Sequence, residues 1–199
     1  MTKFEIIELV RRFHESSTRR LHLVPSENTL SSYSRLPFVS DLLHRYSFPV
    51  DGPNWAWPGT DELVTIEIEA CRMLSSLLGA RYVNLKPLSG IGAMVIAVSA
   101  LSQPGGTVLS IAESDGGHGS TRFITQQLGL RFFDLPFDRA NYTVNPDAVR
   151  DLITRESLTG PLLVYLDQFM CLFPHDLLAI RSAIGTDATI CYDGSHVLG

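Results

Sequence analysis

From residue 80 onward, short apolar stretches of strand length alternate with longer stretches in which apolar residues recur every three or four positions. Gly, Pro or Asn separates most of them, as is typical of turns between elements. The short stretches are apolar throughout, as expected for strands covered on both faces. We therefore predict an α/β fold with a mostly parallel sheet covered by helices on both faces. The predicted strands are residues 80–87, 107–113, 130–137, 161–167 and 188–193.

The first part of the chain has another pattern. Residues 3–17 place apolar side chains at helical spacing with charges throughout, which predicts an amphipathic surface helix. A loop, a partly helical stretch and an ordered loop rich in Pro, Gly and Trp should follow, at residues 21–32, 35–48 and 49–62. We expect Thr60 to cap a helix that ends at Gly79.

Composition excludes several classes of protein. The 199 residues are 45% hydrophobic and 19% charged, which suits one folded domain. A net charge of −5 without a basic run argues against binding to nucleic acid or to an anionic membrane. No apolar run reaches membrane-spanning length, and we see no signal peptide. The three cysteines lie far apart in apolar surroundings, as expected for buried free thiols in the reducing cytoplasm.

The stretch "PLSGIGA" (87–93) is a candidate anion site. Its small residues stand at a strand-to-helix junction, where free backbone N–H groups of a helix N-terminus can hold a phosphate. The hydroxyl of Ser89 would add a donor beside Gly90. The pattern is neither a Walker A loop nor a complete G-x-G-x-x-G, and a tight turn that needs glycine would explain it equally well.

Two further strand ends carry titratable side chains. "ESDGGHGST" (113–121) places His118 among small residues that leave room for a flat ring, although a lone histidine is more often structural. "DGSH" places Asp193 at the end of an apolar strand, with His196 three residues later. A carboxylate there could pair with the protonated nitrogen of a pyridine ring. It could also cap a helix or, with His196, ligate a metal, although no further His or Cys cluster supports a metal site.

In this order, the motifs resemble those of serine hydroxymethyltransferase, a fold-type-I pyridoxal-phosphate enzyme. The family has the sequence features "SEN", a Tyr- and Gly-rich loop, "N-V-x-P-x-S-G-x-x-A", "G-G-H" and "D-x-A-H-x-x-G". The corresponding segments here are "PSEN" (25–28), "RYSFPVDGPNWAWPGTDE" (45–62), "NLKPLSGIGA" (84–93), "GGH" (116–118) and "DGSHVLG" (193–199). The resemblance covers nearly the whole chain.

The resemblance implies a role for each matched residue. Ser89 and Gly90 would hold the phosphate of pyridoxal 5'-phosphate. His118 would stack on its pyridine ring, Asp193 would pair with the ring nitrogen, and His196 would lie near the phenolic oxygen.

The resemblance also implies substrate contacts and an assembly. Ser26 would lie near the carboxylate of a small amino-acid substrate. Tyr46 would reach the active site, from across the interface of a dimer or higher oligomer. Residues 1–60 would then form an N-terminal helix with the active-site and dimer-interface loop. Residues 61–199 would form the N-terminal part of the cofactor-binding large domain, which is incomplete here.

Three departures from the family pattern change the expected chemistry. The loop glutamate that handles protons in the folate-dependent reaction falls on Phe48, which cannot exchange a proton. Trp55, Ala56 and Trp57 replace the paired loop tyrosines, so the substrate pocket is reshaped. Ile91 replaces a serine of the phosphate cup. Hydroxymethyl transfer to folate is therefore doubtful, and an aldol-type cleavage or transfer on glycine or a β-hydroxy amino acid is the alternative.

The lysine that attaches the cofactor as a Schiff base has no counterpart here. Lys3 and Lys86 are the only lysines, and neither occupies the position that the family requires. We expect a second polypeptide, a C-terminal half, to supply that lysine, and we expect the chain to be inactive alone. Strands 163–167 and 188–193 would then have exposed neighbours. Two alternatives remain open: a non-catalytic or regulatory paralogue that binds a partner subunit, and another α/β enzyme with the same motif order.

Overall fold

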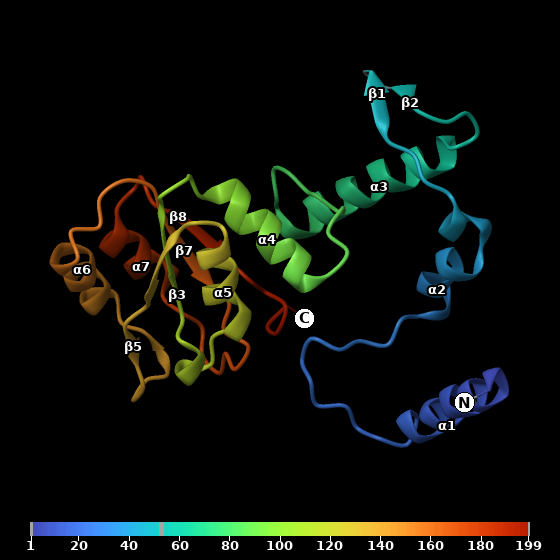
Figure 1. The fold of residues 1–199 in the computed structure, drawn as a ribbon, viewed down its shortest axis with the longest axis horizontal. Coiled ribbons are helices and arrows are strands. Elements are labelled where there is room, and N and C mark those ends of the chain that lie inside the picture. Colours follow the sequence, from blue (N-terminus) through green and yellow to red (C-terminus); the bar gives the residue numbers. More distant parts are fainter. Residues whose placement is uncertain (1, 52–53, 199) are drawn as a thin grey trace.

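The computed structural model describes residues 2–51 and 54–198, and its centre is a parallel sheet of four strands (Figure 1). The strand order is β4-β3-β7-β8, and each neighbouring pair is parallel. The strands are β3 (Thr107–Ser110), β4 (Arg131–Asp134), β7 (Leu162–Leu166) and β8 (Thr189–Tyr192). The prediction of a mostly parallel sheet is confirmed.

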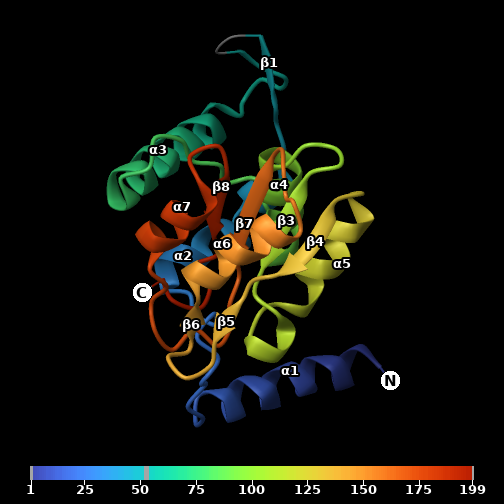
Figure 2. The ribbon, with the colours of Figure 1, turned by 90° about the vertical axis from the view of Figure 1, so that its left-hand side faces the viewer.

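Helices cover both faces of this sheet, as predicted (Figures 1 and 2). On one face, α4 (Gly90–Leu101) and α5 (Gly119–Gln127) pack over a core cluster that includes Val108 and Leu163. On the other face, α6 (Pro146–Arg155) and α7 (Leu177–Ile184) pack over a second cluster that includes Leu109 and Val164. A single strand contributes side chains to both clusters because successive side chains of a strand point to opposite faces of the sheet.

The central strand β7 shows why these residues form a strand. All five of its side chains are buried, three facing α6 and α7 and two facing α4 and α5. Burial of each apolar side chain stabilises the fold by about 1.5–3 kcal/mol. Because β3 and β8 flank β7 on its two sides, the expectation that strand 163–167 has an exposed neighbour is wrong. Among the described strands, β4 and β8 form the edges of the sheet.

One local prediction is also wrong, and one element was not predicted. Residues 80–87 form no strand, since no described strand lies beside them to complete a hydrogen-bond ladder, and Tyr82 remains 80% exposed. Conversely, a small antiparallel hairpin forms after β4, from β5 (Phe137–Asp138) and β6 (Thr143–Val144). Asp138 stabilises its turn by accepting hydrogen bonds from the backbone of Ala140 and Asn141. A short 3-10 helix, η2 (Glu113–Asp115), follows β3.

The N-terminal segments extend away from the sheet (Figure 1). They comprise α1 (Lys3–Ser17), α2 (Ser32–Val39), η1 (Asp41–His44), a two-strand ladder of β1 (Pro49–Asp51) with β2 (Asn54–Trp55), and α3 (Asp61–Leu78). The helix over residues 3–17 is confirmed. Within the predicted loop 49–62, Gly52 and Pro53 lie outside the described residues, as does Gly199 at the end of the last motif. None of α1, α2 and α3 has a buried residue, so their apolar faces remain exposed.

The ends of α3 agree with the predicted boundaries, although its cap differs. Gly79 adopts the left-handed conformation (φ +61°) that ends the helix. The Thr60 side chain makes no capping hydrogen bond to the helix. Its hydroxyl instead donates to the carbonyl of Trp57 at 2.7 Å and to the Ser47 hydroxyl at 3.2 Å. Thr60 therefore ties the preceding loop to the start of the helix.

The cysteines are free thiols, and each is partly exposed rather than fully buried. Burial raises the pKa of the Cys191 thiol, the one that packs against the core under α4 and α5. Within residues 2–51 and 54–198, no helix combines the length and the apolar character needed to cross a bilayer.

His175 makes the stability of the second core sensitive to pH. It is 7% exposed, and its Nδ1 accepts a hydrogen bond from the backbone amide of Val144 at 3.2 Å. Burial lowers the pKa of its imidazole, so the folded state favours the neutral ring. This contribution to stability is present above the pKa of the unfolded chain and is lost as the pH falls through that value.

We predict that the urea concentration at the unfolding midpoint decreases when the pH is lowered from about 7 to about 5, a range that spans the ordinary histidine pKa. The decrease should be larger in the native protein than in His175→Asn. Asparagine can offer an acceptor in place of Nδ1 but does not titrate. Parallel pH dependences in the two proteins would contradict this assignment.

Candidate functional site

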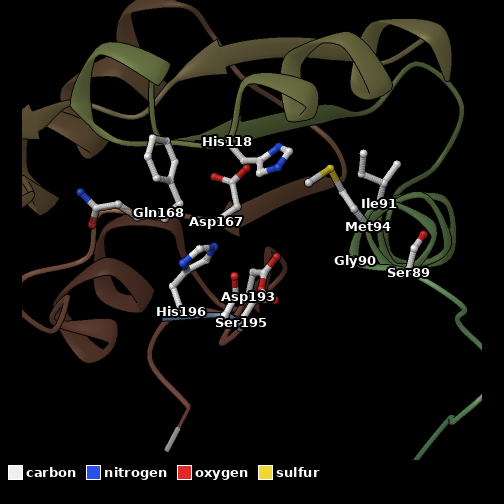
Figure 3. Close-up of a pocket in the computed structure, with 12 residues that line it drawn as sticks. Ser89, Gly90, Ile91, Met94, His118, Asp167, Gln168, Asp193, Ser195 and His196 are labelled. Carbon is white, nitrogen blue, oxygen red and sulfur yellow. Dashed lines mark hydrogen bonds between the residues drawn. The ribbon is translucent and has the colours of Figure 1, made fainter. Parts of the chain in front are cut away.

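A pocket of about 580 Å³ opens at the carboxyl ends of β3, β7 and β8, next to the N-terminus of α4. Ligands of open α/β sheets bind at this edge. Six of the seven site residues predicted from the sequence line it: Ser26, Ser89, Gly90, His118, Asp193 and His196. The fold thus brings residues from distant parts of the sequence to one cavity (Figure 3).

The N-terminus of α4 presents backbone donors to the pocket. Ser89 is the N-cap, and its Oγ accepts from the amide of Gly92 at 3.0 Å. The amide of Ala93 donates to the Ser89 carbonyl at 2.8 Å. The amides of Gly90 and Ile91 belong to the first turn, where intrahelical partners are lacking, so they can donate to an anion. The Ser89 hydroxyl proton is also available for this purpose.

A glycine turn holds His118 at the start of α5. Gly116 has φ +88°, a conformation that side chains disfavour. A Cβ at Gly117 would lie 1.9 Å from the carbonyl oxygen of Ile111, so no larger residue fits. His118 is the N-cap of α5, and its Nδ1 accepts from the amide of Ser120 at 3.2 Å. That bond requires an unprotonated Nδ1, so the neutral ring carries its proton on Nε2.

Asp193 follows β8 and turns the chain toward the pocket. Its Oδ1 accepts from the amide of Ser195 at 2.9 Å and from the Ser195 hydroxyl at 2.5 Å. No hydrogen bond among the described residues uses its Oδ2, which can therefore bind a ligand. The described residues after Asp193 form a turn and no helix, so the carboxylate stabilises a turn rather than capping a helix, and it lines the pocket at the same time.

His196 carries an unsatisfied polar atom. Its Nδ1 is buried and has no hydrogen-bond partner among the described residues. Its ring packs edge-on against Phe169 with centroids 6.4 Å apart. A buried nitrogen without a partner costs about 1–3 kcal/mol, so a ligand that supplies a hydrogen bond here would recover that free energy.

Sequence reasoning missed Asp167, which also lines the pocket. It follows β7 and is 4% exposed. Burial raises the pKa of its carboxyl, opposed by hydrogen bonds from the hydroxyls of Thr121 and Ser110 and by the nearby His118. The signal was present in the sequence, because "PLLVYLD" ends an apolar strand with an acid just as "ATICYD" does.

Tyr46 is the predicted site residue that the fold does not bring to the pocket. It is 69% exposed, and its ring packs edge-on against Trp57 with the ring centroids 6.1 Å apart. Phe48 is 50% exposed and packs edge-on against the same indole with the ring centroids 6.3 Å apart. Together these three rings form an aromatic cluster on the loop before α3.

The pocket contains no fixed positive charge. Asp167 and Asp193 line it, and no Lys or Arg of the described residues does. Lys86, the lysine nearer in sequence to Ser89, forms an ion pair with Glu67, with 2.6 Å between its Nζ and the Glu67 Oε2. The described residues also hold no cluster of three or more His, Cys, Asp or Glu side chains suited to a metal ion. Among the described residues, the N–H groups at the start of α4 and the Ser89 hydroxyl are therefore the donors available to an anionic group, and the two carboxylates are available to a cationic one.

Comparisons with known proteins give a consistent family. A profile of the serine hydroxymethyltransferase family matches residues 1–159. Fluorothreonine transaldolase from Streptantibioticus cattleyicolor is 34% identical over 203 residues, which cover 98% of this chain and 31% of that protein. L-threonine:uridine-5'-aldehyde transaldolase from a Streptomyces species is 33% identical over 96% of this chain and 46% of its own length. Serine hydroxymethyltransferase from Pyrobaculum neutrophilum is 33% identical over a region that covers 98% of this chain and 45% of that protein.

A solved structure supports the fold. The L-threonine transaldolase from Pseudomonas fluorescens superimposes with a TM-score of 0.78 at 24% identity, covering 98% of this chain and 46% of that one. The chain thus spans between about a third and a half of the length of the relatives described here.

Proposed function

The chain belongs to the serine hydroxymethyltransferase family, whose cofactor is pyridoxal phosphate, and we propose that it forms the cofactor-holding part of an enzyme that acts on glycine or a β-hydroxy amino acid. The observation that carries this proposal is the convergence of an N–H-rich helix terminus, a histidine and an acid on one pocket. Each group suits a different part of the cofactor.

The residues present fit pyridoxal phosphate. The amides of Gly90 and Ile91 with the Ser89 hydroxyl suit a phosphate, since the pocket offers no lysine or arginine. The unpaired Nδ1 of His196 suits the phenolic oxygen of the ring. Asp193 suits the ring nitrogen, because its Oδ2 accepts no hydrogen bond from the described residues.

Each residue then has a defined task. Bound pyridoxal phosphate supplies an electron sink for the bond that breaks at the amino acid's α-carbon. Asp193 would keep the proton on the ring nitrogen, which would maintain that sink. His118 would stack on one side of the ring. Ser26, at the pocket wall, would bind the substrate carboxylate.

The reaction class that we propose is an aldol-type cleavage or transfer rather than transfer to folate. Phe48 stands where the family has the proton-handling glutamate, and it packs against Trp57. A phenyl ring cannot provide general acid–base catalysis, which typically contributes about 10²–10⁴-fold to the rate. Two of the relatives described above are named transaldolases, which agrees with this assignment.

The pocket contains no lysine that could form the Schiff base with the cofactor. Lys3 and Lys86 are the only lysines in the sequence, and neither lines the pocket. We propose that a segment outside these 199 residues supplies it, either as a continuation or as a separate chain. The free thiols agree with a cytoplasmic location for such a complex.

We propose an oligomer as well. The apolar face of α1 has no partner in the described chain: Ile6, Val10 and Phe13, which share one side of the helix, are 48%, 64% and 66% exposed. Exposed apolar surface on this scale is typical of interaction sites. Tyr46 lies on the same unpacked half of the molecule, which is consistent with a contribution from across an interface.

Substitution of Asp193 tests the cofactor site. We expect Asp193→Ala to weaken binding of pyridoxal phosphate by at least about tenfold, which corresponds to about 1.4 kcal/mol, as measured by absorbance or by quenching of tryptophan fluorescence. Asp187→Ala, on the exposed loop before the same strand, is the matched control and should bind normally. Equal affinities would refute the assignment. If Asp193→Ala also leaves the biological activity intact, the non-catalytic alternative is favoured.

Acceptor use separates the two reaction classes. With the lysine-bearing polypeptide present, we expect L-threonine to be cleaved, or its glycine unit transferred to an added aldehyde, at rates that tetrahydrofolate does not change. We expect a folate-dependent rate only after Phe48→Glu, with Phe48→Leu as its control. A native protein that requires tetrahydrofolate would overturn this proposal.

The oligomer is tested by sedimentation velocity. Val10→Glu with Phe13→Glu should shift the protein to a smaller species, because charges on the apolar face of α1 oppose association. Arg20→Ala, at the exposed end of the same segment, should leave the distribution unchanged. A monomeric native protein would contradict the proposal.

A further inference from the structure

Asp167 forms a buried link between three elements of the fold. Its Oδ1 accepts from the hydroxyl of Ser110 on β3 at 2.8 Å, and its Oδ2 accepts from the hydroxyl of Thr121 on α5. Asp167, Ser110 and Thr121 are 4%, 0% and 1% exposed, so water does not compete for these bonds. The carboxyl therefore joins the ends of β3 and β7 to the first turn of α5.

That first turn carries His118. Thr121 lies three residues after His118, and its amide donates to the His118 carbonyl at 3.1 Å. The ring itself is oriented by the bond between its Nδ1 and the amide of Ser120. Where the turn sits in space thus decides where the imidazole sits. Figure 3 shows the carboxyl of Asp167 beside the His118 ring at the pocket wall.

Packing of the apolar core alone does not require an acid at this position. The preceding residues on the same face of β7 are Leu163 and Tyr165, which pack in the core under α4 and α5. An apolar residue would continue that core without the cost of burying a carboxyl. What an apolar residue could not do is accept hydrogen bonds from two elements at once.

We propose that Asp167 is a positioning residue for His118: through Thr121 it fixes the start of α5 so that the imidazole lies flat against the ring of the bound cofactor. The inference rests on the proposed cofactor site. Ser110 attaches the same carboxyl to the sheet, whereas Thr121 attaches it to the histidine. The two hydroxyls therefore form a matched pair of probes.

The first experiment measures the affinity for pyridoxal phosphate. Asp167→Ala, Thr121→Val and His118→Ala should each weaken binding about tenfold, whereas Ser110→Ala should change it by less than about threefold. Asp167→Asn, which can still bond both hydroxyls, should restore most of the affinity. In a His118→Ala background, Thr121→Val should weaken binding by less than about a further twofold, because the histidine that Thr121 positions is already absent. Additive effects of the two substitutions would overturn the proposal.

The second experiment needs no cofactor. The side-chain NMR resonance of His118, assigned by its loss in His118→Ala, should shift and broaden in Thr121→Val and remain unchanged in Ser110→Ala. An unchanged resonance in Thr121→Val would overturn the proposal even if binding weakened. If Asp167→Ala does not fold, Thr121→Val still decides the question. If Asp193→Ala does not affect binding, the cofactor proposal fails, and the resonance of His118 alone decides whether Asp167 positions it.

Discussion

The parallel ladder between β7 and β8 continues one step beyond the strands, because the backbone amide of Asp193 donates to the carbonyl of Leu166 at 2.7 Å. This bond sets Asp193 beside Asp167 at the end of the neighbouring strand. In a parallel sheet all carboxyl ends meet at one edge, so the same constraint brings the turn after β3, with His118, to the same place. The pocket depends on this register, because a shift of one residue between β7 and β8 would turn Asp193 to the opposite face of the sheet.

The charge distribution in the pocket follows from that arrangement. Two carboxyls lie at strand ends with no lysine or arginine beside them, so the positive character of the pocket comes from the N–H groups of α4. Phosphate at the helix and a protonated ring nitrogen at the acid are complementary to these two regions. The buried Nδ1 of His196 adds a polar atom for which the described protein provides no partner. This separation of donors and acids agrees with the proposed cofactor, which has an anionic phosphate and a protonated ring nitrogen.

The two halves of the molecule differ in how they are stabilised. The α/β part buries side chains on both faces of its sheet, whereas α1, α2 and α3 bury none. Helices without tertiary packing are marginal on their own, even with a capping box such as that formed by Thr2 and Glu5. Their exposed apolar faces are the physical reason to place an interface there, and the aromatic cluster of Tyr46, Phe48 and Trp57 lies on the same half.

The sequence alone predicted the parallel sheet, four of its strands and six of the twelve residues that line the pocket. These predictions follow from local rules: apolar runs, glycine at turns such as Gly79, and strand ends that converge on one edge. It could not determine that residues 80–87 lack a ladder or that residues 137–144 form a hairpin, because both depend on which strands lie alongside. Only the tertiary structure showed which hydroxyls Asp167 binds. Its partners Ser110 and Thr121 are 57 and 46 residues away, and such contacts leave no periodic signal in the sequence.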